Sequence, residues 1–92
     1  MIRNDNLVKA FVDGAKNLRN GSMSVIGDKL FSYATCIAQR TDDGFIVNLS
    51  GYSPTTSRHQ SNLRNALRNC KYSVVGKDKH IPRGTSDLVG YL

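Results

Sequence analysis

The residues that could do chemistry gather in one segment, YSPTTSRHQSNLRNALRNCK, between Tyr52 and Lys71. A histidine in this segment, His59, follows four hydroxyl side chains closely: Ser53, Thr55, Thr56 and Ser57. A histidine that removes a proton from a nearby hydroxyl, or from a thiol such as Cys70, is the arrangement of a nucleophilic hydrolase. The chain has no glutamate, however, and no GxSxG, Walker or HExxH motif. We therefore expect no catalytic residues and a protein that is not an enzyme.

The hydroxyl cluster also marks the start of a helix. Pro54 disfavours helical geometry at the residue before it, and the hydroxyls after it can cap free backbone N–H groups, so the helix should begin near residues 55–57. Free N–H groups at a helix start can bind a phosphate. The hydroxyls therefore mark a candidate anion site; alternatively, they only cap the helix and close the loop. They are Ser53, Thr55, Thr56 and Ser57.

The predicted helix has an apolar face and a basic face. At 100° per residue, the inner arc has Gln60 at its edge and holds Thr56, His59, Leu63, Ala66, Leu67 and Cys70. The outer arc has no carboxylate and holds Arg58, Ser61, Asn62, Arg64, Asn65, Arg68 and Asn69. Arginine presents a planar fork that suits phosphate, and asparagine offers donors and acceptors to phosphates, sugars or base edges. The outer arc therefore predicts nucleic-acid binding, with an ordinary solvated helix face as the alternative.

The charge of the chain supports a polyanionic partner. Its net charge is +6, of which residues 1–46 contribute +1 and residues 47–92 contribute +5. Residues 76–84, GKDKHIPRG, are basic and turn-rich, and we expect a loop or arm that becomes ordered on a ligand. The residues predicted to bind nucleic acid or a ribonucleoprotein are Arg58, Asn62, Arg64, Asn65, Arg68, Lys71, Lys77, Lys79 and Arg83.

Other ligand classes find no support in the sequence. Cys36 and Cys70 form no CxxC pair, and His59 and His80 complete no zinc spacing, so we expect free thiols, no metal and no cofactor. No basic helix carries exposed aromatic or leucine anchors, so we expect no membrane partner. The chain has no apolar run that could span a bilayer and no signal-peptide core, so we expect a cytoplasmic protein.

These residues must be positioned by helices and strands, and the sequence predicts that these form one α+β domain over residues 1–92. A first helix should be capped by Asn4 or Asp5, include Leu18 on its apolar face and stop at Asn20-Gly21. Strands are predicted near residues 22–26, 29–33, 35–40, 45–49 and 72–75, with reversals at Gly27-Asp28 and at residues 41–44. The order is α-β-β-β-β-α-β, which predicts a mainly antiparallel sheet of four to five short strands with two helices on one face.

Three motifs resemble a group of small phage-encoded and prophage-encoded proteins. They are SYATxIA at Ser32–Ala38, DGFIVN at Asp43–Asn48 and YSPTTSRHQSxLRxAL at Tyr52–Leu67. The resemblance covers roughly residues 22–70, and it implies a protein that acts in the cytoplasm of an infected host cell. Small non-enzymatic phage proteins include anti-CRISPR proteins. Because this chain is basic, the resemblance implies binding to the guide RNA or the nucleic-acid path of a CRISPR effector complex rather than imitation of DNA.

Two other functions remain open. One is a homo-oligomeric phage structural or assembly protein, in which sheet edges or exposed Phe31 and Tyr33 make the contacts and no nucleic acid is bound. The other is a small hydrolase that uses His59. The sequence leaves the oligomeric state undetermined.

Overall fold

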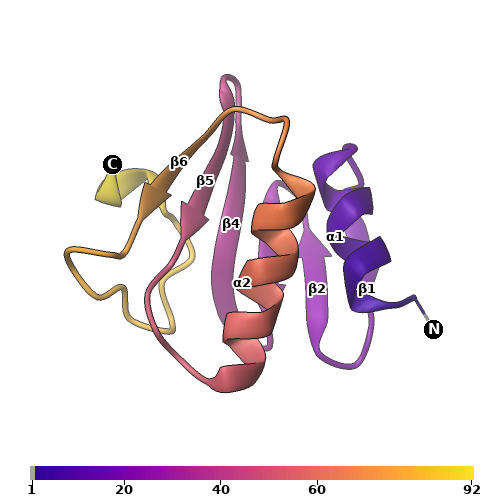
Figure 1. The fold of residues 1–92 in the computed structure, drawn as a ribbon, viewed down its shortest axis with the longest axis horizontal. Helices are drawn as coiled ribbons and strands as arrows, with labels where there is room; N and C mark the ends of the chain where they lie inside the picture. Colours follow the sequence, from indigo (N-terminus) through magenta and orange to yellow (C-terminus); the bar gives the residue numbers. More distant parts are fainter. Residues whose placement is uncertain (1) are drawn as a thin grey trace.

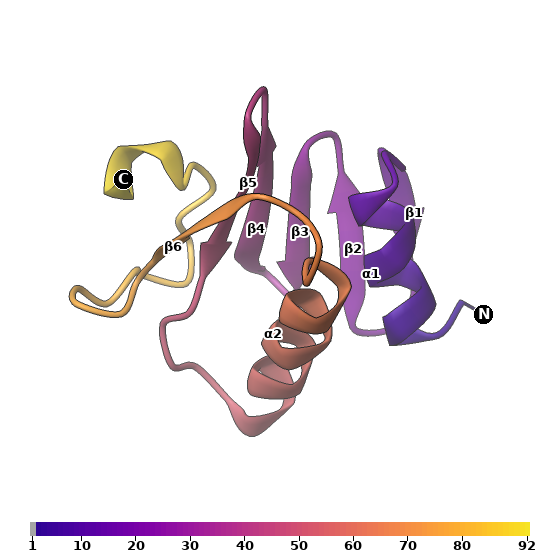
Figure 2. The ribbon, with the colours of Figure 1, turned by 45° about the horizontal axis from the view of Figure 1, so that its top comes forward.

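The computed structural model describes residues 2–92, and it places two helices on one face of a six-stranded sheet (Figures 1 and 2). This is the α+β fold predicted from the sequence, with one strand more than the four to five expected. The elements are α1 (Asn4–Val12), β1 (Asn17–Arg19), β2 (Met23–Ile26), β3 (Lys29–Ser32), β4 (Thr35–Thr41), β5 (Gly44–Asn48), α2 (Pro54–Ala66), β6 (Tyr72–Val75) and a short 3₁₀ turn, η1 (Val89–Tyr91).

The strands lie in the sheet in the same order as in the sequence, from β1 to β6. Each of the first four pairs antiparallel with the next, because tight turns join them, among them the predicted reversals at Gly27-Asp28 and residues 41–44. Strand β6 pairs parallel with β5, with Val47 opposite Val74. A parallel neighbour requires a crossover of a dozen residues or more, and α2 supplies it.

The first helix is shorter than predicted, and the extra strand takes its place. Helix α1 ends at Val12, and Gly14 follows with φ +111°, a conformation that favours glycine. The guanidinium of Arg40 donates to the carbonyls of Phe11 and Ala15, which stabilises this end. Leu18 therefore leaves the helix and pairs with Val25 across β1 and β2. The prediction of one helix that includes Leu18 was wrong.

The start of α1 also differs from the prediction. Its cap residue is Arg3, which makes no capping bond with its side chain, so neither Asn4 nor Asp5 caps the helix. The Asn4 side chain instead reaches α2, where its Nδ2 lies 3.2 Å from Nε2 of His59. The structure thus uses Asn4 to join the two helices.

The sheet has a core on each face. On the helix side, α1 contributes Leu7, Val8 and Phe11, and α2 contributes Leu63 and Leu67, all fully buried. On the other side, the C-terminal segment brings Ile81 and Leu88 against Cys36, Ile46 and Val75. The backbone N–H of Leu88 also donates to Oε1 of Gln39 at 2.9 Å. The C-terminal segment therefore docks onto the domain and covers the face that the helices leave open.

Candidate nucleic-acid interface

Helix α2 begins at Pro54, slightly earlier than the predicted range of residues 55–57. Ser53 is its cap, and its Oγ accepts a hydrogen bond of 3.1 Å from the backbone N–H of Thr56. The same hydroxyl donates to Oγ1 of Thr56, a side chain that is itself buried. Of the four residues of the candidate anion site, Ser53 and Thr56 thus serve as capping groups, and only Thr55 and Ser57 are exposed.

The inner face of α2 carries the histidine in a buried chain of hydrogen bonds. His59 is 2% exposed, and its Nδ1 lies 2.6 Å from Oγ of Ser32. The side chain of Asn20 fixes the orientation of the Asn4 amide, because its Nδ2 donates to Oδ1 of Asn4 at 2.7 Å. The Asn4 Nδ2 must then donate to Nε2 of His59, so the imidazole proton lies on Nδ1 and is donated to Ser32. Burial lowers the pKa of His59 below its ordinary value of 6.5.

This geometry bears on the hydrolase alternative. A catalytic imidazole accepts the proton of its nucleophile, whereas His59 donates a proton to Ser32. Ser32 is also fully buried, and its hydroxyl contacts Oγ1 of Thr56 at 3.1 Å. A substrate has no access to this pair, so the arrangement favours a structural role for His59.

The outer face of α2 is exposed and carries no negative charge. Arg58, Arg64, Asn65 and Arg68 are exposed, and Asn62 is half-buried. The ion pairs among residues 2–92 join Arg3 to Asp5 and Arg40 to Asp28, and neither pair involves α2. The guanidinium groups of this helix therefore face solvent without a carboxylate partner within the described part of the chain.

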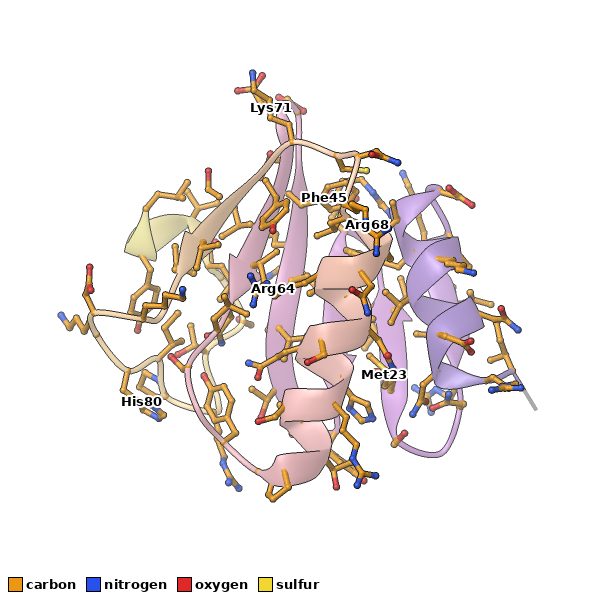
Figure 3. All side chains as sticks on the ribbon, viewed as in Figure 1. Met23, Phe45, Arg64, Arg68, Lys71 and His80 are labelled. Carbon is orange, nitrogen blue, oxygen red and sulfur yellow. The ribbon has the colours of Figure 1, made fainter. Side chains whose placement is uncertain are left out.

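Two of these arginines share a hollow. Arg64 lies in the last turn of α2 and Arg68 in the turn that follows the helix (Figure 3), and together with Ser61, Asn65 and Tyr72 they line a shallow depression of about 340 Å³. Tyr72 comes from β6 and is half-buried, so its ring forms part of the surface. The hollow combines two cationic forks, an amide, a hydroxyl and an aromatic ring, which are the groups that contact phosphates and unpaired bases. We call these five residues the α2 hollow.

Sequence reasoning placed neither Ser61 nor Tyr72 at the binding site. Ser61 could have been included, because it belongs to the outer arc of the predicted helix. Tyr72 carries a weaker signal: alternation along β6 puts it on the sheet face opposite to Val75, and Val75 belongs to the core below the C-terminal segment. That parity places Tyr72 on the helix side, but only the fold reveals which helix residues it meets.

The remaining predicted residues lie elsewhere. Asn62 lines a different depression, beside Arg3 and Asn20 near the start of α1. Lys71 is exposed next to the turn between β4 and β5, away from the centre of α2 (Figure 3). The exposed bases of residues 76–84 are separated from α2 by the loop that joins β5 to α2 (Figures 1 and 2), and they are Lys77, Lys79 and Arg83. The predicted surface is therefore divided into several parts.

Residues 76–84 form an anchored loop. Ile81 is fully buried, its N–H donates to Oγ of Ser50 at 2.9 Å, and its carbonyl accepts from the hydroxyl of Tyr52. Ser50 also donates to the carbonyl of Gly76, where an added Cβ would lie 2.5 Å from the Ser50 Oγ. The sequence predicted a loop or an arm at residues 76–84, and the structure has a loop there. Tyr52 helps to hold this loop, because its hydroxyl also accepts from Nδ2 of Asn48 at 2.9 Å.

Metal ligands do not gather in the described part of the chain. Among residues 2–92, no three His, Cys, Asp or Glu side chains lie close enough to hold a metal ion, and Cys36 and Cys70 are free thiols. Burial raises the pKa of the Cys36 thiol to about 11, which makes it unreactive near neutral pH. No helix within residues 2–92 has the length and apolar composition needed to cross a membrane.

Comparison with protein-family models matches residues 4–81 to DUF8033, a family of unknown function. Neither the curated proteins nor the solved structures contain a match to the chain.

Proposed function

The chain belongs to the DUF8033 family, and we propose that it is a non-enzymatic protein that binds nucleic acid through the outer face of α2. The observation that carries this proposal is the α2 hollow, with Arg64 and Arg68 exposed and no carboxylate near them among the described residues. Both arginines keep their donors free for a phosphate, which guanidinium groups bind through paired hydrogen bonds.

The spacing of the two arginines supports an anionic ligand. Like charges that are held close together on one surface repel each other. Arg64, in the last turn of α2, and Arg68, just after the end of the helix, line the same hollow, and α2 has no acidic residue that would relieve their repulsion. A bound phosphate would remove the repulsion, so this arrangement favours the complex over the free protein.

Tyr72 narrows the kind of nucleic acid. Its half-buried ring borders the hollow, and aromatic rings at such positions stack on bases that are not paired. A phosphate held by Arg64 and Arg68 would bring the neighbouring base to this ring. The proposed ligand is therefore a single strand or an unpaired loop, in preference to a continuous duplex.

A ribonucleoprotein is the narrower form of the proposal. The resemblance of Tyr52–Leu67 to phage proteins favours a host target, and a basic hollow fits the exposed RNA of such a complex. A CRISPR effector complex, contacted at its guide RNA or nucleic-acid path, is the target that the resemblance and the charge favour together. The protein would then inhibit host defence.

A salt titration with matched variants tests the proposal. We would titrate labelled single-stranded RNA, single-stranded DNA and a duplex into the wild-type chain, an Arg64→Gln/Arg68→Gln variant and a Lys9→Gln/Lys16→Gln control. The control removes two exposed bases near α1 and changes the net charge equally. The α2 variant should lose at least about tenfold more affinity than the control, and its salt dependence should fall by about 0.7 for each lost phosphate contact on a single strand. Equal losses in the two variants would show that only net charge matters and would refute the proposed site.

Capture from a host lysate tests the narrower form. Tagged protein should retain a ribonucleoprotein, and the Arg64→Gln/Arg68→Gln variant should retain much less of it. Nuclease treatment before capture should have the same effect as the double substitution. A protein partner that is retained equally after nuclease treatment and by the variant would overturn the ribonucleoprotein proposal.

A further inference from the structure

The two edges of the sheet differ in how well they are protected. At one edge, β1 has three residues, and Asn17 and Arg19 are exposed, so it offers a short polar strand. At the other edge, β6 contains Val74 and Val75, no proline, and no irregularity in its pairing with β5 (Figure 1). Short strands, charges, prolines and bulges are the usual means of preventing an edge from pairing with another chain. The β1 edge is short and charged, whereas the β6 edge has neither a proline nor a bulge.

The β6 edge offers unpaired backbone groups. Phe45 donates its N–H to the carbonyl of Lys71 at 3.1 Å, and Leu49 donates to the carbonyl of Val75 at 2.9 Å. In a parallel ladder a strand turns alternate residues toward one neighbour, so Ser73 also faces β5. Tyr72 and Val74 therefore direct their N–H and C=O groups away from the sheet. These four groups are arranged to receive another strand.

Apolar side chains flank this edge on both sides. The described residues include five large apolar side chains that are exposed: Ile26, Tyr33, Val74, Val89 and Leu92. Three of them gather at the β6 edge, since Val74 lies on β6 and is 41% exposed, while Val89 and Leu92 of the C-terminal segment are 47% and 69% exposed. Two hollows run between β6 and this segment. A strand added to the edge would bury apolar area as well as form hydrogen bonds.

From these observations we infer that β6 pairs antiparallel with β6 of a second copy of the chain, about a two-fold axis at Ser73. Tyr72 then lies opposite Val74 of the other copy, and the two residues exchange both backbone hydrogen bonds. Two-fold symmetry repeats this pair, which gives four bonds in an interface made of the same surface on both copies. The six-stranded sheets join into one continuous sheet of twelve strands.

Charge complementarity identifies the second copy as the occupant. Asp42 and Asp43 lie beside the start of β6, where they line a hollow with Lys71 and Tyr72. Lys77, Asp78 and Lys79 line the hollow at the end of β6, so this end carries a net charge of +1, whereas Asp42, Asp43 and Lys71 give the start of the strand a net charge of −1. Antiparallel pairing places the start of one β6 opposite the end of the other, so the two carboxylates face the partner's lysines. A foreign strand has no reason to carry this pattern.

Disulfide trapping gives the sharpest test of the register. A Ser73→Cys substitution puts two thiols at the two-fold axis, in a position not bridged by hydrogen bonds, where Cα atoms are about 4.5 Å apart. Disulfides form at such separations. Mild oxidation should convert the variant to a covalent dimer within the time in which an Asn17→Cys control, on the other edge, remains monomeric. Trapping in neither variant, or equally in both, would overturn the inference.

Solution mass provides an independent test that does not depend on oxidation. Light scattering on the wild-type chain should give about 20 kDa at high concentration, twice the 10.2 kDa of one chain. Val74→Pro removes only an N–H that points away from β5, and proline is tolerated at such edge positions, so this variant should fold and remain monomeric. Ile26→Lys changes an apolar residue elsewhere that is even more exposed than Val74, and it should leave the dimer intact. A wild-type mass of 10.2 kDa at millimolar concentration, or a dimer that survives Val74→Pro, would refute the pairing.

Charge reversal separates a second copy from a foreign strand. Asp42→Lys/Asp43→Lys should weaken the dimer, and combining it with Lys77→Asp/Lys79→Asp should restore it. These measurements use no nucleic acid, so they stand or fall separately from the proposed function. Failure of the restoration, with both variants folded by circular dichroism, would contradict the assigned orientation.

Discussion

The inner and outer faces of α2 differ in whether their polar side chains have partners within the domain. On the inner face, the polar side chains have partners within the domain: His59 bonds Ser32 and Asn4, and Gln60 donates to the carbonyls of Asn48 and Ser50. On the outer face, the arginines have no carboxylate partner among the described residues. The inner face therefore determines stability, and the outer face is free to contact a ligand. One helix separates the two tasks, so each can be disturbed without the other.

The largest effect should come from the apolar part of the inner face. Leu63 is fully buried between the helices and the sheet, so Leu63→Ala should lower the free energy of unfolding by about 2–5 kcal/mol. Urea denaturation followed by circular dichroism measures this loss. If α2 binds nucleic acid as we propose, the fraction that remains folded should have the wild-type affinity, and a lower affinity per folded molecule would contradict the separation of the two faces.

Removing the buried imidazole should have the next largest effect. His59→Ala leaves the Asn4 amide and the Ser32 hydroxyl without this partner, at a cost of about 1–3 kcal/mol for each buried group. The two groups together would cost about 2–6 kcal/mol, and because Ser32 keeps its contact with Thr56, we expect a loss in the lower half of that total, about 2–4 kcal/mol. His80 is exposed, so His80→Ala is the matched control and should change stability by less than about 0.5 kcal/mol.

The pH dependence of stability should sharpen the account of the inner face. Burial lowers the pKa of His59 in the folded state, so below about pH 6.5 the unfolded chain binds a proton that the folded chain does not. Stability should therefore fall as the pH decreases from 7 toward the lowered pKa, by at most about 1.4 kcal/mol per pH unit. Chemical denaturation at a series of pH values measures the slope. It should flatten in His59→Gln and persist in His80→Gln, and the reverse result would exclude His59 as its cause.

The smallest effect on stability belongs to the outer face. Arg64 is an exposed basic residue in the last turn of α2, where the helix dipole favours it and the neighbouring Arg68 repels it, so Arg64→Gln should change stability by less than about 0.5 kcal/mol in either direction. The midpoint of thermal unfolding at low salt measures this small change. A loss of more than 1 kcal/mol would mean that Arg64 stabilises the fold, and the two faces of α2 would no longer have separate tasks.

Local patterns were sufficient to predict much of this arrangement. The 100° periodicity assigned His59 and Leu63 to the inside of α2 and the arginines to the outside, because a long helix with a clear apolar stripe has one way to pack. Turn chemistry predicted the reversals at Gly27-Asp28 and at residues 41–44. Each of these features depends on residues close together in the sequence.

Features that depend on distant residues were not predicted. The partners of His59 lie 27 and 55 positions away, at Ser32 and Asn4, and no local pattern connects them. The α2 hollow requires Tyr72 from a strand whose parallel pairing follows from the whole topology. The early end of α1 was missed because Leu18 fits an apolar helix face as well as it fits strand β1. The positive φ of Gly14 ends the helix before Leu18.

The parallel pairing of β6 with β5 has a consequence for when the proposed ligand site forms during folding. The first five strands pair across short turns, so they can form early, whereas β6 must find β5 across the whole of α2. Contacts that close long stretches of chain form slowly, because the entropy of the closed loop is lost before the contact is gained. Tyr72 is the first residue of β6, so the hollow is completed only in this late step. Only the fully folded protein would then bind the ligand, and a chain still being synthesised would not.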